Sequence, residues 1–370
     1  MKLSKIFFFS IFLSLFACGS SSGDLGDDNT KPDSKEDTSG YQWEKDRTTL
    51  LNYHDMVLIY GGGSHRVHLW GTDYLAPYVT CVDKNNVEHW FFDSFLFLEI
   101  YNGNSSQFAA GYGRPAATQQ DWKNLVDYYF QSKTALGGLD KTIAAAIERI
   151  GAPKTKRRVV IGIPEPIQGQ TNWGSVKDGV MLNFSKDADR ITACKWYIDY
   201  VRSKFKELNY KNIELAGFYW IAEQATQTKT ILNSLATYLN SLKYTFNWIP
   251  YYNAAGYSEW KSFGFNYAYL QPNYFFSEST PDSRLDSACS LANANSMDME
   301  MEFDNRVFSG WGYRLTNYMN AFKKYGIWSK RRLAYYQGDA TVYYMSKSTT
   351  DDDKQLYQNF CNFIIERPLY

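Results

Sequence analysis

One stretch of nine residues, from Ser296 to Asp304, alternates strictly between apolar and acidic side chains. In an extended strand its methionines and Phe303 would lie on one face, and its acidic members would lie on the other: Asp298, Glu300, Glu302 and Asp304. A strand at a protein surface shows the same pattern. Here, however, other apolar segments surround it, each followed by a helix-like segment, which predicts a parallel barrel covered by helices. The methionines then pack under the helices, and the carboxylates point into the barrel.

Burying carboxylates inside a barrel costs free energy unless they have polar partners or a catalytic role, and their pKa values should be perturbed there. Two interpretations follow. The acidic face of 296–304 is either a functional cluster or an internally satisfied network of ion pairs and hydrogen bonds. The first is favoured, because the neighbouring strand ends add further polar groups.

Hydrophobic periodicity predicts eight strands, at residues 56–61, 95–100, 157–163, 212–221, 245–251, 267–274, 296–304 and 332–337. Helical spacing is found at residues 119–130, 139–150, 187–208, 228–242, 282–294, 313–325 and 352–366. Residues 77–83 and 87–92 flank Asn85 and Asn86 and predict a hairpin in place of a first crossover helix. The order predicts an α/β fold, a (β/α)8 TIM barrel with an irregular, hairpin-like first crossover. It forms one domain over residues 41–370.

Residues 1–17 predict a secretory signal peptide, because Lys2 and Lys5 precede the apolar run 6–16. The sequence Leu15-Phe16-Ala17-Cys18 resembles a bacterial lipobox, which implies a lipid on Cys18. Residues 18–40 are polar and acidic and lack an apolar period, so we expect a disordered tether. An acidic tether after a lipid also resembles the export signal of Bacteroidetes surface lipoproteins. We therefore expect a lipid-anchored protein at the outer membrane or cell surface, with the periplasmic face as an alternative.

The charge balance excludes partners that bind by electrostatics alone, such as nucleic acid, because Lys plus Arg and Asp plus Glu both number 39. Aromatic residues make up 18% of the chain, which suits core packing and also flat platforms for sugar rings. No dinucleotide or phosphate-loop motif is found, and no cofactor is predicted. His65 and His68 are interpreted as ordinary loop histidines and not as a metal pair.

The remaining cysteines are expected to be small buried thiols. Cys194, Cys289 and Cys361 fall on predicted helices that are not neighbours in a barrel, which keeps their sulfur atoms apart. Asp93 precedes the second strand, so a structural role at the N-terminal end of the barrel is expected for it.

Reactive groups of such barrels lie at the C-terminal ends of the strands. In this sequence those positions carry carboxylates, amides and tyrosines: Glu99, Glu165, Glu223, Tyr251, Tyr252, Gln271, Asn273, Tyr274, Glu300 and Glu302. Sugar hydroxyls need paired donors and acceptors, and glycosidic cleavage needs two carboxyl groups whose pKa values differ. The strand ends therefore favour an oligosaccharide or polysaccharide as the partner.

Five segments carry a resemblance to a known family: W-F-F-D-S-F-L-F-L at 90–98, G-F-Y-W-I-A-E at 217–223, W-I-P-Y-Y at 248–252, Q-P-N-Y-F-F at 271–276 and M-E-M-E-F-D at 299–304. They are similar to those of an uncharacterised family of bacterial secreted and lipid-anchored proteins, labelled as a domain of unknown function. That family resembles in fold the (β/α)8 glycoside hydrolases, which place catalytic Glu residues at strands 4 and 7. The match covers roughly residues 50 to 365.

This resemblance implies a glycoside hydrolase, with retention of configuration favoured. Glu302 would be the nucleophile and Glu223 the acid/base, while Glu300, Glu165, Tyr251, Tyr252, Gln271, Asn273 and Tyr274 would position the sugar. One departure concerns Ala222, since hydrolases of this group commonly have Asn directly before the strand 4 Glu. The alternative is a glycan-binding surface lipoprotein that keeps the barrel but does not cleave.

Overall fold

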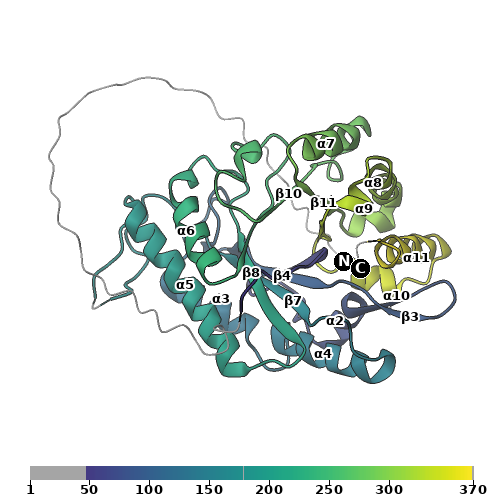
Figure 1. Cartoon of the computed structure of the whole chain (residues 1–370), viewed down its shortest axis with the longest axis horizontal. Coiled ribbons are helices and arrows are strands. Elements are labelled where there is room, and N and C mark those ends of the chain that lie inside the picture. Colours follow the sequence, from purple (N-terminus) through teal and green to yellow (C-terminus); the bar gives the residue numbers. More distant parts are fainter. Residues whose placement is uncertain (1–46, 178, 369–370) are drawn as a thin grey trace. The chain divides into compact units, whose positions relative to one another are not determined.

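The computed structural model describes residues 47–177 and 179–368, and over them the chain forms a closed barrel of eight parallel strands (Figure 1). The barrel strands are β1 (Asp55–Tyr60), β4 (Ser94–Leu98), β7 (Arg157–Ile163), β8 (Ile213–Trp220), β9 (Thr245–Trp248), β10 (Tyr267–Leu270), β11 (Asp298–Glu302) and β12 (Leu333–Tyr336). They pair in chain order, and β1 closes the ring between β4 and β12. The predicted (β/α)8 barrel is confirmed. The predicted signal peptide, Cys18 and the tether lie outside the described residues.

Helices surround the barrel on the outside (Figure 1). They are α2 (Thr72–Val79), α3 (Gln119–Tyr129), α4 (Ala135–Ile150), α5 (Asp187–Leu208), α6 (Lys229–Ser241), α7 (Ser283–Ala294), α8 (Gly312–Lys324), α9 (Ile327–Lys330), α10 (Thr341–Lys347) and α11 (Asp351–Ile365). Two short 3-10 helices, η1 (Tyr257–Glu259) and η2 (Asn305–Ser309), follow β9 and β11. Among the described residues, no helix combines the length and the apolarity that crossing a membrane requires.

The first crossover differs in part from the prediction. A hairpin is present, formed by the antiparallel strands β2 (Thr80–Val82) and β3 (Glu88–Trp90). It does not replace a helix, however, because α2 precedes it and includes Pro77, where the sequence predicted the start of a strand. A proline inside a helix removes one backbone donor, so its presence disguised a segment that buries Leu75, Tyr78 and Val79. A second small hairpin, β5 (Tyr101–Asn102) with β6 (Ser106–Gln107), was not predicted.

β11 is buried on both faces, as its alternation predicted. Met299 and Met301 are fully buried on the outer face, and the ring of Phe303 packs edge-on against Phe360 of α11 at 5.2 Å between centroids. Glu300 and Glu302 alternate with these methionines and therefore lie on the inner face, in register with Ala334 and Tyr336 of β12. Helix packing on one side thus fixes the carboxylates on the other.

The N-terminal end of the barrel is closed by buried acids that have partners. Asp93 accepts hydrogen bonds from the backbone N–H groups of His54 at 2.8 Å and Asp55 at 2.9 Å, which ties β4 to β1. Asp55 itself forms a fully buried ion pair with Arg367 and accepts a hydrogen bond from the Tyr335 hydroxyl at 2.6 Å. Asp93 therefore lies where a structural role was expected.

A bulge interrupts the regular pairing of β8 before the strand reaches the C-terminal opening of the barrel, which we call the mouth. Val159 and Val160 of β7 pair with Leu215 and Gly217, so Ala216 is the extra residue. Gly217 is required because β9 approaches closely there: an added Cβ would lie 1.9 Å from the Thr245 hydroxyl oxygen. The residues after the bulge lead to Glu223.

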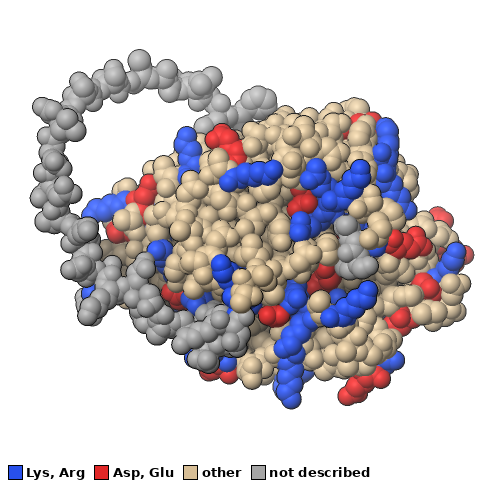
Figure 2. Space-filling view, in the orientation of Figure 1, with Lys and Arg blue, Asp and Glu red and all other residues tan. Residues whose placement is uncertain are grey.

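The cysteine prediction is confirmed for the described residues: Cys81, Cys194, Cys289 and Cys361 are free and buried. On the face shown in Figure 2, positive and negative side chains are scattered among uncharged residues, in keeping with the equal numbers of the two signs.

Candidate active site

Three glutamates meet inside the C-terminal end of the barrel, and we call them the acidic trio: Glu223, Glu300 and Glu302. Glu300 and Glu302 lie on β11 and are 2% and 0% exposed. Glu223 follows the end of β8 by three residues and is partly buried. The charges of Glu302 and Glu223 both raise the pKa of Glu300.

Glu302 has several donors on one side. Its Oε2 accepts a hydrogen bond from the Tyr318 hydroxyl of α8 at 2.5 Å and a longer one from the backbone N–H of Tyr274 at 3.4 Å. Burial raises the pKa of Glu302 to about 7, while the bond from Tyr318 and the amide groups of Gln271, Tyr274 and Asn273 favour the ionised form. Its Oε1 is buried and accepts no hydrogen bond from any described residue.

Glu223 and Glu300, unlike Glu302, have no hydrogen-bond donors among the described residues. Within the described residues, neither carboxyl has a hydrogen bond or an ion pair. Burial, and then the charge of Glu302, raises the pKa of Glu223 to about 7. The pKa of Glu300 lies well above its usual value, first through burial and then through the charges of Glu302 and Glu223. At neutral pH Glu223 and Glu302 thus each hold a proton part of the time, and of the two only Glu302 has hydrogen bonds that favour its ionised form.

Four further tyrosines border the trio, and sequence analysis did not assign them to the site. They are Tyr60 at the end of β1, Tyr112, Tyr219 on β8 and Tyr336 at the end of β12, and we call them the mouth tyrosines. Burial raises the pKa of each, and charges of the trio raise them further. They therefore stay neutral and offer hydroxyl groups and aromatic faces next to the carboxylates.

The predicted sugar-binding residues at the end of β10 divide into two groups. Gln271 and Asn273 lie beside Glu302, and their side chains are joined by a hydrogen bond of 3.0 Å. Tyr274 turns away: its hydroxyl donates to Asp282 at 2.5 Å and accepts from Asn317 at 2.9 Å, on the outer helices. Only the backbone N–H of Tyr274 faces Glu302. The expectation that the Tyr274 side chain binds the sugar has no geometric support.

The other predicted binding residues lie further around the rim. Glu165 follows β7, is 5% exposed and accepts a hydrogen bond from the backbone N–H of Ala110 at 2.8 Å. Burial raises the pKa of Tyr112, and the charges of Glu223 and Glu165 raise it further. Tyr251 donates to the Gln224 side chain at 3.2 Å, next to Glu223.

Tyr252, which was also predicted to bind the sugar, lies beneath Arg284, with 4.4 Å from the guanidinium carbon to the ring centroid. No described contact joins it to the trio. Of the predicted set, the structure thus gathers Glu223, Glu300, Glu302, Gln271 and Asn273 into one group. Glu165 and Tyr251 extend it.

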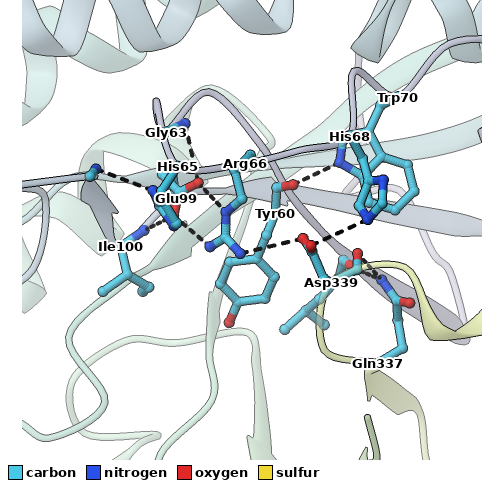
Figure 3. A network of polar contacts seen from close by, with 12 residues as sticks. Tyr60, Gly63, His65, Arg66, His68, Trp70, Glu99, Ile100, Gln337 and Asp339 are labelled. Carbon is cyan, nitrogen blue, oxygen red and sulfur yellow. Dashed lines mark hydrogen bonds and ion pairs between the residues drawn. The ribbon is translucent and has the colours of Figure 1, made fainter. Parts of the chain in front are cut away.

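A network of polar contacts holds one side of the mouth (Figure 3). Arg66 forms a two-pronged ion pair with Glu99, both contacts measuring 2.7 Å, and also faces Asp339 at 3.5 Å. His68 lies 3.3 Å from the other oxygen of Asp339. The guanidinium group covers the ring of Tyr60 at 4.9 Å (Figure 3), so the network fixes one of the mouth tyrosines.

Chemically, the mouth offers a pair of carboxyl groups in contrasting environments, flanked by amides and phenols. Among residues 47–177 and 179–368, no group of three or more His, Cys, Asp or Glu side chains is arranged to hold a metal ion. Two carboxyl groups that differ in hydrogen bonding are suited to general acid and nucleophilic work on an acetal.

Comparisons with known proteins place the chain in a family. The family described as "Domain of unknown function (DUF4855)" matches residues 55–362. No curated protein matches the chain.

Solved structures with a similar arrangement include three from different organisms. A Bacteroides thetaiotaomicron protein described as an alpha-L-fucosidase is 12% identical, with a TM-score of 0.44, and 93% of this chain and 99% of that one are covered. A family 18 chitinase of Crocus vernus is 11% identical, with a TM-score of 0.41 and coverage of 82% and 98%. The carboxyl transferase domain of Rhizobium etli pyruvate carboxylase is 7% identical, with a TM-score of 0.38 and coverage of 87% and 48%. Such distant similarity transfers no activity to this chain.

Proposed function

The chain belongs to the family described as "Domain of unknown function (DUF4855)", and we propose that it hydrolyses glycosidic bonds at the acidic trio. One observation carries the proposal: Glu302 on β11 and Glu223 after the end of β8 both lie at the C-terminal end of the barrel, and they differ in hydrogen bonding, while the charge of Glu302 raises the pKa of Glu223. A pair of carboxyl groups with separate roles is the requirement for glycoside hydrolysis.

Glu302 is the nucleophile in this proposal. Its Oε2 is held by Tyr318, and its Oε1, which accepts no hydrogen bond from the described residues, forms the bond to the anomeric carbon. Glu223 donates its proton to the leaving oxygen as the glycosidic bond breaks. It then takes a proton from water, whose oxygen displaces Glu302 and releases the sugar. Two displacements at one carbon retain its configuration.

The remaining groups of the mouth orient the sugar. Gln271 and Asn273 offer amide donors and acceptors next to Glu302, and Glu300 lies below it on the same strand. The mouth tyrosines provide faces for the apolar side of a pyranose ring. No cofactor takes part in the proposed reaction.

The test begins with a panel of plant and host glycans and activated aryl glycosides, with release of reducing ends as the measurement. Glu302→Gln should remove nearly all turnover, whereas Glu223→Gln should do so less completely for leaving groups that need no protonation. The matched control is Glu207→Gln, an exposed residue near the end of α5, far from the mouth. Full activity of Glu302→Gln would refute the assignment.

Azide rescue tests the stereochemistry. Added azide should restore turnover in Glu302→Ala with inverted product and in Glu223→Ala with retained product. Rescue with the opposite pattern would contradict the assigned roles. Binding of glycans by the wild type without cleavage of any would favour the alternative, a glycan-binding protein on the same scaffold.

The cellular setting is a separate proposal, supported by the sequence of residues 1–40. A lipid on Cys18 would attach the barrel to the outer membrane or cell surface through a polar tether. Cys18→Ser should abolish palmitate labelling and partitioning into detergent while the barrel stays folded. Continued labelling of Cys18→Ser would refute the proposal.

A further inference from the structure

The β2–β3 hairpin of the first crossover is covered by α11, the last helix of the described chain. Cα atoms of β2 and α11 approach within 8 Å of each other. The Gln358 side chain of α11 donates a hydrogen bond to the backbone carbonyl of Val82 at 3.3 Å, across 276 residues of sequence. Just after β3, the ring of Phe91 meets Phe360 edge-on, with 5.9 Å between centroids. The hairpin and the helix therefore form one packed contact.

Two cysteines meet inside this contact. Cys81 is the middle residue of β2 and is 3% exposed, whereas the next side chain, Val82, is 45% exposed, as strand alternation requires. Cys361 is fully buried and lies three residues after Gln358, on the same side of α11. The two thiols share a hydrogen bond, so their sulfur atoms are in contact. At the sequence level Cys361 was compared only with other helical cysteines, and its partner lies on a strand instead.

We propose that Cys81 and Cys361 are a disulfide-forming pair, which is oxidised by thiol–disulfide exchange and then ties the β2–β3 hairpin to α11. The proposal does not depend on the glycoside hydrolase function. One cysteine thiolate attacks a disulfide oxidant such as oxidised glutathione, forms a mixed disulfide and releases one thiolate. The second cysteine thiolate attacks the cysteine sulfur of the mixed disulfide and releases the other. The two cysteine protons end on the released thiolates, and two electrons pass from the pair to the oxidant, which leaves as two thiols.

The exchange needs an accessible thiolate, and the completed fold offers none at this pair. The hydrogen bond with Cys361, and then burial, raises the pKa of Cys81 well above its usual value. We therefore place the exchange before α11 docks on the hairpin, when both thiols are hydrated. Once α11 has docked, the same burial shields the disulfide from reductants.

The disulfide would hold a helix that supports the strands of the proposed site. Phe360, next to Cys361, packs against Phe303 at 5.2 Å and against Tyr335 at 5.8 Å between ring centroids. Phe303 directly follows β11, and Tyr335 lies on β12. A bond between residues 81 and 361 also closes a very long loop, which reduces the conformational freedom of the unfolded chain. Oxidation should therefore raise the melting temperature.

Refolding under defined redox conditions tests the pair. The full chain carrying Cys18→Ser, so that only the cysteines of the barrel react, is unfolded, reduced and refolded with either oxidised or reduced glutathione. Remaining thiols are alkylated in denaturant and located by peptide mass spectrometry. After oxidation we expect a linked Cys81–Cys361 peptide. Cys194 and Cys289 should still be alkylated, because they lie on α5 and α7, which follow different strands of the barrel.

Melting curves measure the effect on stability. The oxidised protein should melt at least about 5 °C above the reduced protein, and the difference should vanish in Cys81→Ala and in Cys361→Ala. Cys289→Ala is the matched control, since it removes an equally buried thiol and should keep the difference. If Cys361→Ala does not fold, the peptide map of the unsubstituted pair still decides.

Two results would overturn the proposal. One is oxidised, refolded protein in which Cys81 and Cys361 are both alkylated or both carry glutathione. The other is linkage spread without preference among the four described cysteines. An unchanged melting temperature in the linked protein would overturn the supporting role given to the disulfide.

Discussion

Replacing Tyr318 with Phe removes one hydrogen-bond donor to the proposed nucleophile, Glu302, and keeps the aromatic ring. The Tyr318 hydroxyl donates to Oε2 of Glu302 at 2.5 Å, and both side chains are fully buried. The bond stabilises the ionised carboxylate against the cost of burial. Tyr318→Phe therefore favours the protonated, unreactive form of Glu302.

The size of the effect follows from the hydrogen bond. A hydrogen bond to a charged group contributes about 1.5 to 3 kcal/mol, which corresponds to about 1 to 2 pKa units. Since the pKa of Glu302 is about 7 in the wild type, it would rise to about 8 or 9. At pH 7 the ionised fraction would fall from about one half to between a tenth and a hundredth, so kcat/KM should fall about 5- to 50-fold.

The assay is the pH profile of kcat/KM with an activated aryl glycoside, whose leaving group needs no proton from Glu223. The acid limb of the profile should move to higher pH in Tyr318→Phe, and activity should recover at alkaline pH. Tyr313→Phe, on the same helix but 52% exposed, is the control and should keep the wild-type profile. An unmoved limb, or a loss that persists at alkaline pH, would refute the role given to Tyr318.

Three further predictions concern stability. In the folded protein Glu302 keeps its proton up to about pH 7, whereas in the unfolded chain it keeps it only up to about pH 4.5. Ionisation of Glu302 therefore lowers the free energy of unfolding as the pH rises from 4.5 to 7, by about 3 kcal/mol at most. Glu302→Gln should thus melt at a higher temperature than wild type at pH 8 and at the same temperature at pH 4; a lower Tm at pH 8 would contradict this. Asp93→Asn should reduce the free energy of unfolding by about 1 to 3 kcal/mol in denaturant titrations, since one backbone donor loses its acceptor, with kcat/KM preserved; a stable but inactive variant would be inconsistent with its position. Gly217→Ala places a methyl group 1.9 Å from the Thr245 hydroxyl oxygen and should yield little soluble folded protein, and normal yield and Tm would show that β8 and β9 can separate.

The sequence predicts the architecture well where polar residues bound an apolar run sharply. β7 and α5 match their predicted bounds, Arg157–Ile163 and Asp187–Leu208. β9 and β10 are shorter than predicted, because Pro250 and Pro272 follow them and cannot donate to a strand ladder. Beyond the ends of β9 and β10, Tyr251 and Gln271 form an isolated parallel bridge.

The sequence predicts those site residues that follow from the alternation of a strand or from its end. The alternation of apolar and acidic residues in 296–304 assigned Glu300 and Glu302 to the barrel interior. Glu223 was assigned to the site because it directly follows a predicted strand. Tyr274 was misplaced because Asn273 has a positive φ of 52°, which turns the chain so that the next ring faces the helices. Tyr318 was missed because helical spacing on α8 is typical of core packing, and only the tertiary structure brings its hydroxyl to Glu302.

The barrel closes by pairing its first strand with its last, and the formation of the active site depends on this closure. β1 pairs with β12, and Asp55 contacts Tyr335 and Arg367 across 280 and 312 residues of sequence. Before that seam forms, water reaches the inner faces of β8 and β11, and the trio consists of ordinary hydrated acids. The perturbed ionisation on which catalysis would depend is therefore a property of the completed ring alone. Turnover, once a substrate is known, would report on closure of the seam as directly as any probe of folding.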